Sequence, residues 1–231
     1  MEENNEIVVD GNVESQVIEN LSYFASPIFK IDMPQYIDVV REAGEEAMQL
    51  VPEDIQSSEL YPSKQSVSFQ AHPKIEEFAQ KTIQNAWDIL NMQGYDMQNF
   101  TTYYESMWLQ EHHKMSMMEQ HIHGYGIQLV GFYFLDVPPD SSRLIFNDPR
   151  PGKVQNDLPE ADTRNVTFAS KMINFEPKAG ELIFAPAWLP HSFSRHGSDE
   201  ILRFVHINIL VEYKPQVCQN EHPPEDGPVI I

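Results

Sequence analysis

The first half of the chain places its apolar residues at helical intervals. In residues 73–92 they recur every three or four positions and Gly94 follows the run, which predicts a helix with one buried face. Residues 34–50 repeat the spacing with acidic residues on the opposite face, and Pro34 suits a first turn. Stripes of this kind are usually core, so we expect both helices to pack on the outside of a sheet and to carry no chemistry.

After Gly94 the pattern changes to short runs rich in β-branched and aromatic residues. Gly, Pro and Asp separate these runs, and no helical run interrupts them. The expected strands cover residues 100–109, 127–137, 143–146, 166–175, 181–184 and 201–211. An earlier run, 24–31, contains Pro27 and is expected to form at most an edge strand. Many short strands with such turns are typical of a barrel or sandwich, so the sequence predicts a mainly β fold.

The predicted organisation is a single domain over residues 21–213. Its helical support occupies 34–92 and its β core 100–213, and a chain of 231 residues is long enough for one such core. Residues 1–20 are acidic and the segment 214–231 is rich in proline, so both ends are expected to be flexible tails.

The charge balance limits the partners. Thirty-five acidic residues against 15 basic ones give a formal net charge of −20, which disfavours nucleic-acid phosphates and anionic membranes. The chain shows no apolar run of membrane-spanning length and no cationic signal-peptide start. Cys218 is the only cysteine, so an internal disulfide and a thiolate metal site are excluded. Together these features favour a reducing cytoplasm.

Three histidines are the candidate metal ligands. His121 and His123 are separated by one residue, and on an extended strand two such side chains point to the same side. His191 follows a short apolar run and a Pro-Ala-Trp-Leu-Pro corner, and it would complete the set from a distant strand. Imidazole binds Fe, Zn, Cu and Ni alike, so the residues predict a metal site without naming the metal.

Arg203 lies in the apolar run 201–211, where the other odd positions carry Ile or Val. A buried guanidinium needs an anionic partner. This partner is either an acidic side chain of the chain itself or the carboxylate of a ligand, which Arg binds better than Lys does. Together with a metal site, Arg203 favours an acidic co-substrate that spans the metal and the guanidinium. His206 and Asn208, on the opposite face, are expected to be packing residues.

These residues resemble the 2-oxoglutarate- and Fe(II)-dependent oxygenases, specifically those of bacteria and marine phages whose first ligand segment reads His-x-His. The resemblance covers about residues 22–213, and its most specific blocks are Phe146–Arg150, Gly180–His191 and Arg203–Asn208. It implies a double-stranded β-helix, also called a jelly roll. It also implies His121 and His191 as ligands of Fe(II), His123 where most relatives carry a carboxylate, and Arg203 on the distal carboxylate of 2-oxoglutarate.

The resemblance implies a hydroxylase that uses O2, decarboxylates 2-oxoglutarate to succinate and oxidises a second substrate, either a peptide or a small molecule. If the chain is phage-encoded, it would act in the host cytoplasm. Either His123 makes a three-histidine site, which we favour, or Glu119 supplies a carboxylate from the same strand face. Hydroxyl side chains that relatives place near the co-substrate are absent at Val205 and Phe134, which leaves Tyr133 or Tyr125 as candidates for that contact.

Two other classes of protein fit parts of the pattern. A cupin-type metal protein on the same barrel also presents His-x-His and a Gly…Pro…His segment, and it would be a dioxygenase, isomerase or binder without 2-oxoglutarate. Cupins continue with a Glu where Gln128 stands here. A non-catalytic protein that kept the barrel is the third class, but buried polar groups without a role cost stability.

Overall fold

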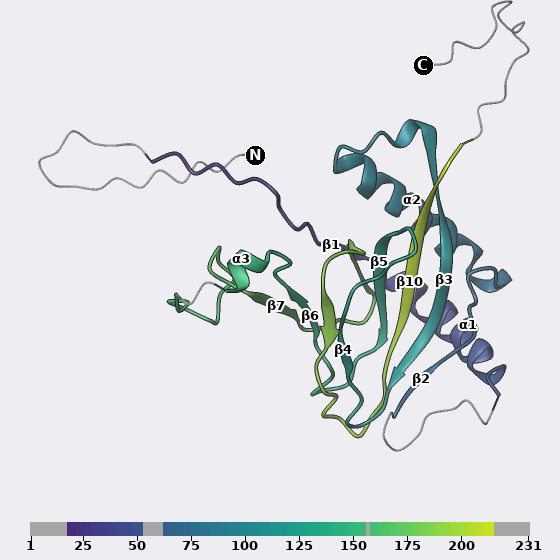
Figure 1. Ribbon diagram of the computed structural model, residues 1–231. Helices are drawn as coiled ribbons and strands as arrows, with labels where there is room; N and C mark the ends of the chain where they lie inside the picture. Colours follow the sequence, from purple (N-terminus) through teal and green to yellow (C-terminus); the bar gives the residue numbers. More distant parts are fainter. Residues whose placement is uncertain (1–17, 53–61, 156–157, 215–231) are drawn as a thin grey trace, which may run out of the picture.

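Two antiparallel sheets form the core of the computed structural model, which describes residues 18–52, 62–155 and 158–214 (Figure 1). The larger sheet has the order β1-β8-β5-β10-β3-β2 and the smaller one the order β4-β9-β6-β7. The strands of the larger sheet are β1 (Phe29–Asp32), β2 (Ser63–Gln65), β3 (Phe100–His112), β5 (Ile127–Asp136), β8 (Glu181–Pro186) and β10 (Leu202–Tyr213). The strands of the smaller sheet are β4 (Met118–His121), β6 (Leu144–Asn147), β7 (Met172–Phe175) and β9 (His191–Phe193). The predicted jelly roll is confirmed.

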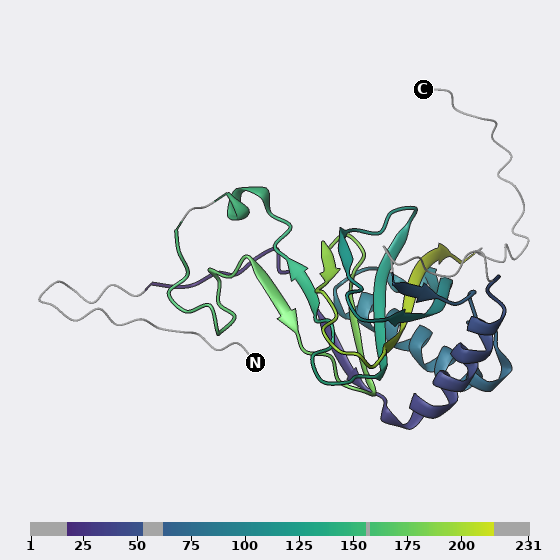
Figure 2. The same cartoon turned by 90° about the horizontal axis from the view of Figure 1, so that it is seen from below.

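The two predicted helices are present. They are α1 (Ile37–Gln49), entered through the 3-10 turn η1 (Pro34–Tyr36), and α2 (Glu76–Met92), entered through η3 (Pro73–Ile75). Both contact β3, and α1 also contacts β5. Figure 2 shows the helices on one side of the strands and the green β7 strand on the other. The helices therefore cover the outer face of the larger sheet, as their apolar stripes predict. The remaining short helices are η4 (Met97–Asn99) and α3 (Pro151–Val154).

The central strand β10 is buried on both of its faces. Val205, Ile207 and Ile209 belong to the apolar cluster that includes residues of α1 and α2. Leu202 and Phe204 belong to the second cluster, which lies between the two sheets. Because successive side chains of a strand point to opposite faces, neighbouring residues of β10 meet different surroundings. The face that a residue occupies decides whether it meets the helices or the space between the sheets.

Strand boundaries differ from the sequence prediction mainly at β7. The predicted strand 166–175 begins only at Met172, because Thr167 and Ser170 form a turn: the Ser170 N–H donates to the Thr167 carbonyl at 3.0 Å, and the Thr167 N–H donates to Ser170 Oγ at 3.0 Å. The predicted ranges also omit β2, β4, β9 and α3, which are three or four residues long. β1 pairs with β8 at the edge of its sheet, as expected for the run 24–31, but it begins only at Phe29, after Pro27.

Two predictions concern the ends of the chain and the membrane. The expected tails lie almost wholly outside the described residues, which begin at 18 and end at 214. Within the described ranges, no helix has both the length and the apolar character needed to cross a membrane.

Candidate metal centre

His121, His123 and His191 converge at one end of the smaller sheet. His121 ends β4 and His191 begins β9, and the two residues are paired in register across the sheet. His123 lies just beyond β4, where its backbone N–H donates to the Ala187 carbonyl at 2.9 Å. The ring centroids are 4.5 Å apart for His121 and His191, 5.2 Å for His121 and His123, and 5.1 Å for His123 and His191. One nitrogen from each ring lies within 4.8 Å of the others, a spacing at which one ion could bind all three.

Hydrogen bonds to backbone carbonyls orient two of these rings. Nδ1 of His121 lies 2.8 Å from the Glu119 carbonyl oxygen, and Nδ1 of His191 lies 2.9 Å from the Leu189 carbonyl oxygen. A carbonyl oxygen only accepts, so each Nδ1 carries the proton and each Nε2 keeps its lone pair. Metal-binding histidines are commonly oriented in this way. The donor chemistry therefore fits a cation bound through Nε2.

The nitrogen atoms that face the cluster have no protein partner. Nε2 of His123 and Nε2 of His191 are buried and make no hydrogen bond. Burial lowers the pKa of His191 to about 3, although the hydrogen bond to the Leu189 carbonyl acts in the opposite direction. Burial and the neighbouring His121 lower the pKa of His123 to about 4, while Asn208 acts in the opposite direction. Both rings are thus uncharged at neutral pH, which is the form that coordinates a metal ion.

A fourth histidine lies beside the three. His206 projects from the face of β10 that looks between the sheets, and its ring is 5.2 Å from that of His123. The ring stacks on Trp108 with centroids 4.2 Å apart and planes 8° apart, and it meets Phe132 edge-on at 4.8 Å. From the sequence we expected His206 to be a packing residue. The sequence shows that His206 and Arg203 point to opposite faces of β10, but it does not show which of these faces meets the metal centre.

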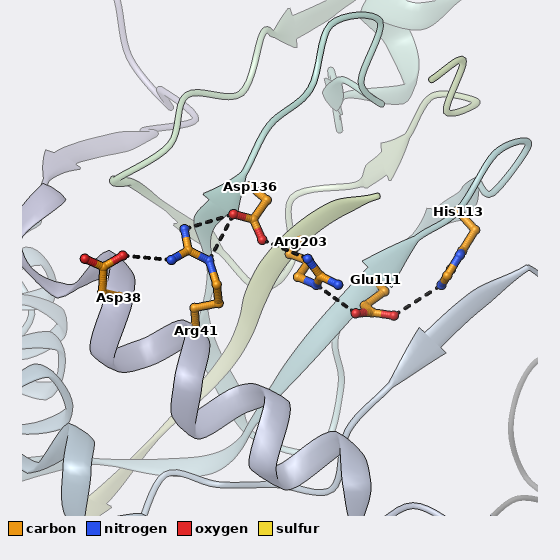
Figure 3. Close-up of polar contacts among 6 residues, drawn as sticks. All are labelled: Asp38, Arg41, Glu111, His113, Asp136 and Arg203. Atoms are coloured by element: carbon orange, nitrogen blue, oxygen red, sulfur yellow. Dashed lines mark hydrogen bonds and ion pairs between the residues drawn. The ribbon is translucent and has the colours of Figure 1, made fainter. Parts of the chain in front are cut away.

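Arg203 lies on the other face of β10, and this corrects its predicted role. Its Nε donates to Glu111 at 2.8 Å and its Nη1 donates to Asp136 at 3.1 Å (Figure 3). Asp136 in turn accepts from Arg41 of α1 at 3.0 Å. Arg203 shares its face with Val205, which packs toward the helices. The internal ion pair, the alternative that we considered, is therefore what the structure contains, and the guanidinium does not face the histidines.

Of the other residues predicted near the co-substrate, Tyr133 lies on the face of β5 that points away from the histidines. Tyr133 is fully buried on the helix side, packs against Phe78 with centroids 4.9 Å apart, and donates its hydroxyl to the Met33 carbonyl at 2.7 Å. Tyr125 is fully exposed in the loop after His123. Glu119 is exposed as well, and the described group of potential ligands comprises the three histidines without it. Strand alternation again explains Tyr133, which occupies the outward face of β5.

A cavity of about 470 Å³ lies between the segment 22–28, strands β6 and β7 and the turn 166–170, and none of the three histidines lines it. Two of its lining residues also contact His191: Phe146 is paired in register with it at a ring distance of 6.1 Å, and the carbonyl of Leu189 accepts a hydrogen bond from its Nδ1. Most of the lining is apolar. The charged part includes Arg150, whose guanidinium makes two hydrogen bonds to Asp148 at 2.9 and 2.7 Å. The cavity is of a size that holds small ligands.

Comparisons with known proteins place this geometry in context. Residues 106–204 match a family model described as "Putative 2OG-Fe(II) oxygenase". No curated protein matches the chain. Among solved structures, the non-heme alpha-ketoglutarate-dependent epimerase SnoN from nogalamycin biosynthesis is similar, with a TM-score of 0.53 and 15% identity over 82% of each chain.

Two further structures are similar to this chain. AviO1 from Streptomyces viridochromogenes Tue57 has a TM-score of 0.55 at 11% identity, covering 83% of this chain and 91% of that one. The collagen prolyl hydroxylase of Paramecium bursaria Chlorella virus-1, solved as a 2OG complex, has a TM-score of 0.50 at 13% identity, covering 79% and 94%. At these identities the likeness shows a shared fold.

Proposed function

We propose, from the premise that residues 106–204 belong to the 2OG-Fe(II) oxygenase family, that this chain is a 2-oxoglutarate- and Fe(II)-dependent dioxygenase. In this reaction O2 converts 2-oxoglutarate to succinate and CO2 while a second substrate is hydroxylated. The observation that carries the proposal is the convergence of His121, His123 and His191, with the Nε2 atoms of His123 and His191 buried and unpartnered.

The side chains around the three histidines would determine how the metal works. Fe(II), when bound, supplies a redox-active cation with open positions for an oxo acid and O2. His121 and His191 would hold it through Nε2, because their Nδ1 atoms are engaged by carbonyls. Three neutral imidazoles leave the full positive charge on the ion, which favours an anionic chelator such as 2-oxoglutarate. Phe132 packs edge-on against His191 at 5.4 Å and helps to exclude water from this side.

The cavity that Phe146 and Leu189 help to line is our candidate for the site of the second substrate. Its apolar walls, Phe146 and Leu189 among them, favour an apolar portion of a small molecule or peptide side chain. The titles of the similar structures describe an epimerase and a prolyl hydroxylase, so they do not select one substrate class for this chain.

The first experiment measures succinate. Purified protein loaded with Fe(II) without oxygen should form succinate when 2-oxoglutarate and air are added, even without the second substrate, because these two reactants meet at the metal alone. His191→Ala should abolish this, since it removes a buried ligand. A matched control is His72→Ala, which changes a histidine on the helical side that bonds Glu46. Full metal occupancy without any 2-oxoglutarate binding would contradict the proposal.

A cupin-type protein without 2-oxoglutarate is the second candidate, and one observation favours it. The predicted carboxylate clamp, Arg203, is occupied by Glu111 and Asp136. In that case the three-histidine ion would act directly on a substrate. The two candidates differ in one measurement, because only the oxygenase changes the visible spectrum of bound Fe(II) when 2-oxoglutarate is added without oxygen.

A further inference from the structure

Buried polar atoms without a partner gather around the candidate metal centre. Nine such side-chain atoms occur among the described residues, and four of them belong to this region. They are Nε2 of His123, Nε2 of His191, Nδ1 of His206 and Oδ1 of Asn208. A metal ion accounts for the first two. An unpartnered buried polar atom costs about 1–3 kcal/mol, so the remaining atoms on β10 call for their own explanation.

His206 lies next to the ion position but outside the ligand group. The group in which all ligand atoms lie within 4.8 Å contains His121, His123 and His191 and excludes His206. Its ring is nevertheless 5.2 Å from that of His123. A ring beside the ligand group but outside it is better placed to contact a molecule bound to the ion than to coordinate the ion.

The His206 ring is also held rigidly. Trp108 stacks on one face at 4.2 Å, and Phe132 meets it edge-on at 4.8 Å. The residue is 1% exposed. A donor held in place before binding loses little freedom when a ligand arrives. If this position served packing alone, an apolar ring would fill it without leaving a buried nitrogen unpartnered. The unpartnered Nδ1 therefore favours a contact with a bound ligand.

We infer that His206, and not Arg203, is the residue of β10 that contacts the co-substrate, by donating Nδ1–H to an oxygen of the metal-chelating 2-oxo acid group. This rests on the proposed function. His206 is close to the three ligands, so its contact is with the chelating end of the co-substrate rather than with the distal carboxylate. Its neutral imidazole offers one N–H donor, which suits a keto or carboxylate oxygen.

The test uses full-length protein loaded with Fe(II) under anaerobic conditions. Two probes are titrated: 2-oxoglutarate, and 2-oxovalerate, which has the same chelating end but no distal carboxylate. Both give a visible metal-to-ligand charge-transfer band on chelation. We expect His206→Phe to lower the affinity for both probes by the same factor, about ten- to a hundredfold, because the substitution removes a hydrogen bond to a charged group. The band should also move to shorter wavelength, because a hydrogen bond to the oxo acid lowers the energy of its acceptor orbital.

Two variants serve as controls. His206→Asn places an amide N–H near the position of Nδ1 and should restore most of the affinity and the band position. Arg203→Lys keeps the charge of the outer ion-pair network and should leave both affinities within about twofold, since only a ligand contact would need the bidentate guanidinium. Loss of 2-oxoglutarate affinity in Arg203→Lys, with no change in His206→Phe, would overturn the inference.

A measurement on the unsubstituted protein makes the test independent of how the variants fold. In Zn(II)-loaded, nitrogen-15-labelled protein, the Nδ1 resonance of His206 should shift when 2-oxoglutarate is added. An unshifted resonance at saturating 2-oxoglutarate would refute the contact while leaving the proposed function intact. A wild-type Fe(II) protein that shows no charge-transfer band with either probe would refute the proposed function itself.

Discussion

Replacing Arg203 with Leu should destabilise the fold and leave the metal centre intact. Arg203 joins Glu111 of β3 and Asp136 of β5, and Asp136 also binds Arg41 of α1 (Figure 3). The substitution removes one ion pair from each carboxylate. Nε2 of His113 still lies 3.2 Å from Oε2 of Glu111, and Arg41 still pairs with Asp136, so neither carboxylate loses every partner.

The magnitude follows from the burial of this network. The side chains of Arg203, Glu111 and Asp136 are 25%, 10% and 27% exposed. Breaking a fully buried pair costs about 3–5 kcal/mol and breaking an exposed one about 0–1 kcal/mol. Because Glu111 is nearly buried and the other two are not, we expect a loss of about 2–3 kcal/mol. For a chain of this length that lowers the melting temperature by about 4–12 °C.

The assay combines urea unfolding at neutral pH with metal binding by the same samples. Glu111→Gln is the matched variant, and the double variant should lose less than the sum of the two single losses, since the residues share one pair. The affinity for Fe(II) should stay unchanged in all three proteins. Unchanged stability in Arg203→Leu together with weakened 2-oxoglutarate binding would refute the account of this residue.

Further predictions concern pH and backbone geometry. Burial lowers the pKa of His112 to about 3, so between pH 6.5 and 3 the unfolded state binds the proton that the folded state does not. The free energy of unfolding is therefore unaffected by this group above pH 6.5 and falls by about 1.4 kcal/mol for each pH unit below it, down to about pH 3. In metal-free protein, His112→Gln should therefore lose about 2 kcal/mol less than wild type in urea unfolding between pH 6.5 and 5, and an identical pH dependence would contradict this. Gly180 has φ +83°, and a Cβ there would lie 2.8 Å from the Pro34 backbone, so Gly180→Ala should lower the melting temperature, whereas Gly152→Ala, with open space around it, should lower it less.

The sequence predicted the elements that depend on local periodicity. The apolar stripes of α1 and α2 and the turn residues between strands identified the helices and most of the larger sheet. The three histidines were also found from the sequence, because His121 and His123 are separated by one residue and a proline-rich corner precedes His191. The structure brings their rings within 5.2 Å of one another.

The roles of the residues on β10 could not be predicted in this way. Both faces of this strand are buried, so alternation separates Arg203 from His206 without showing which of them faces the metal centre. The partners of Arg203 are 92 and 67 residues away in the chain, and only the pairing of β10 with β3 and β5 brings them to it. The same limitation misplaced Tyr133, whose neighbour Phe132 faces the histidines instead.

The most direct test of the three-histidine centre is X-ray absorption spectroscopy of the Fe(II)-loaded protein, compared with its His123→Ala variant. The account predicts three imidazole ligands at the iron in the wild type and two in the variant. An iron site with only two imidazoles in the wild type, and no change on substitution of His123, would contradict it.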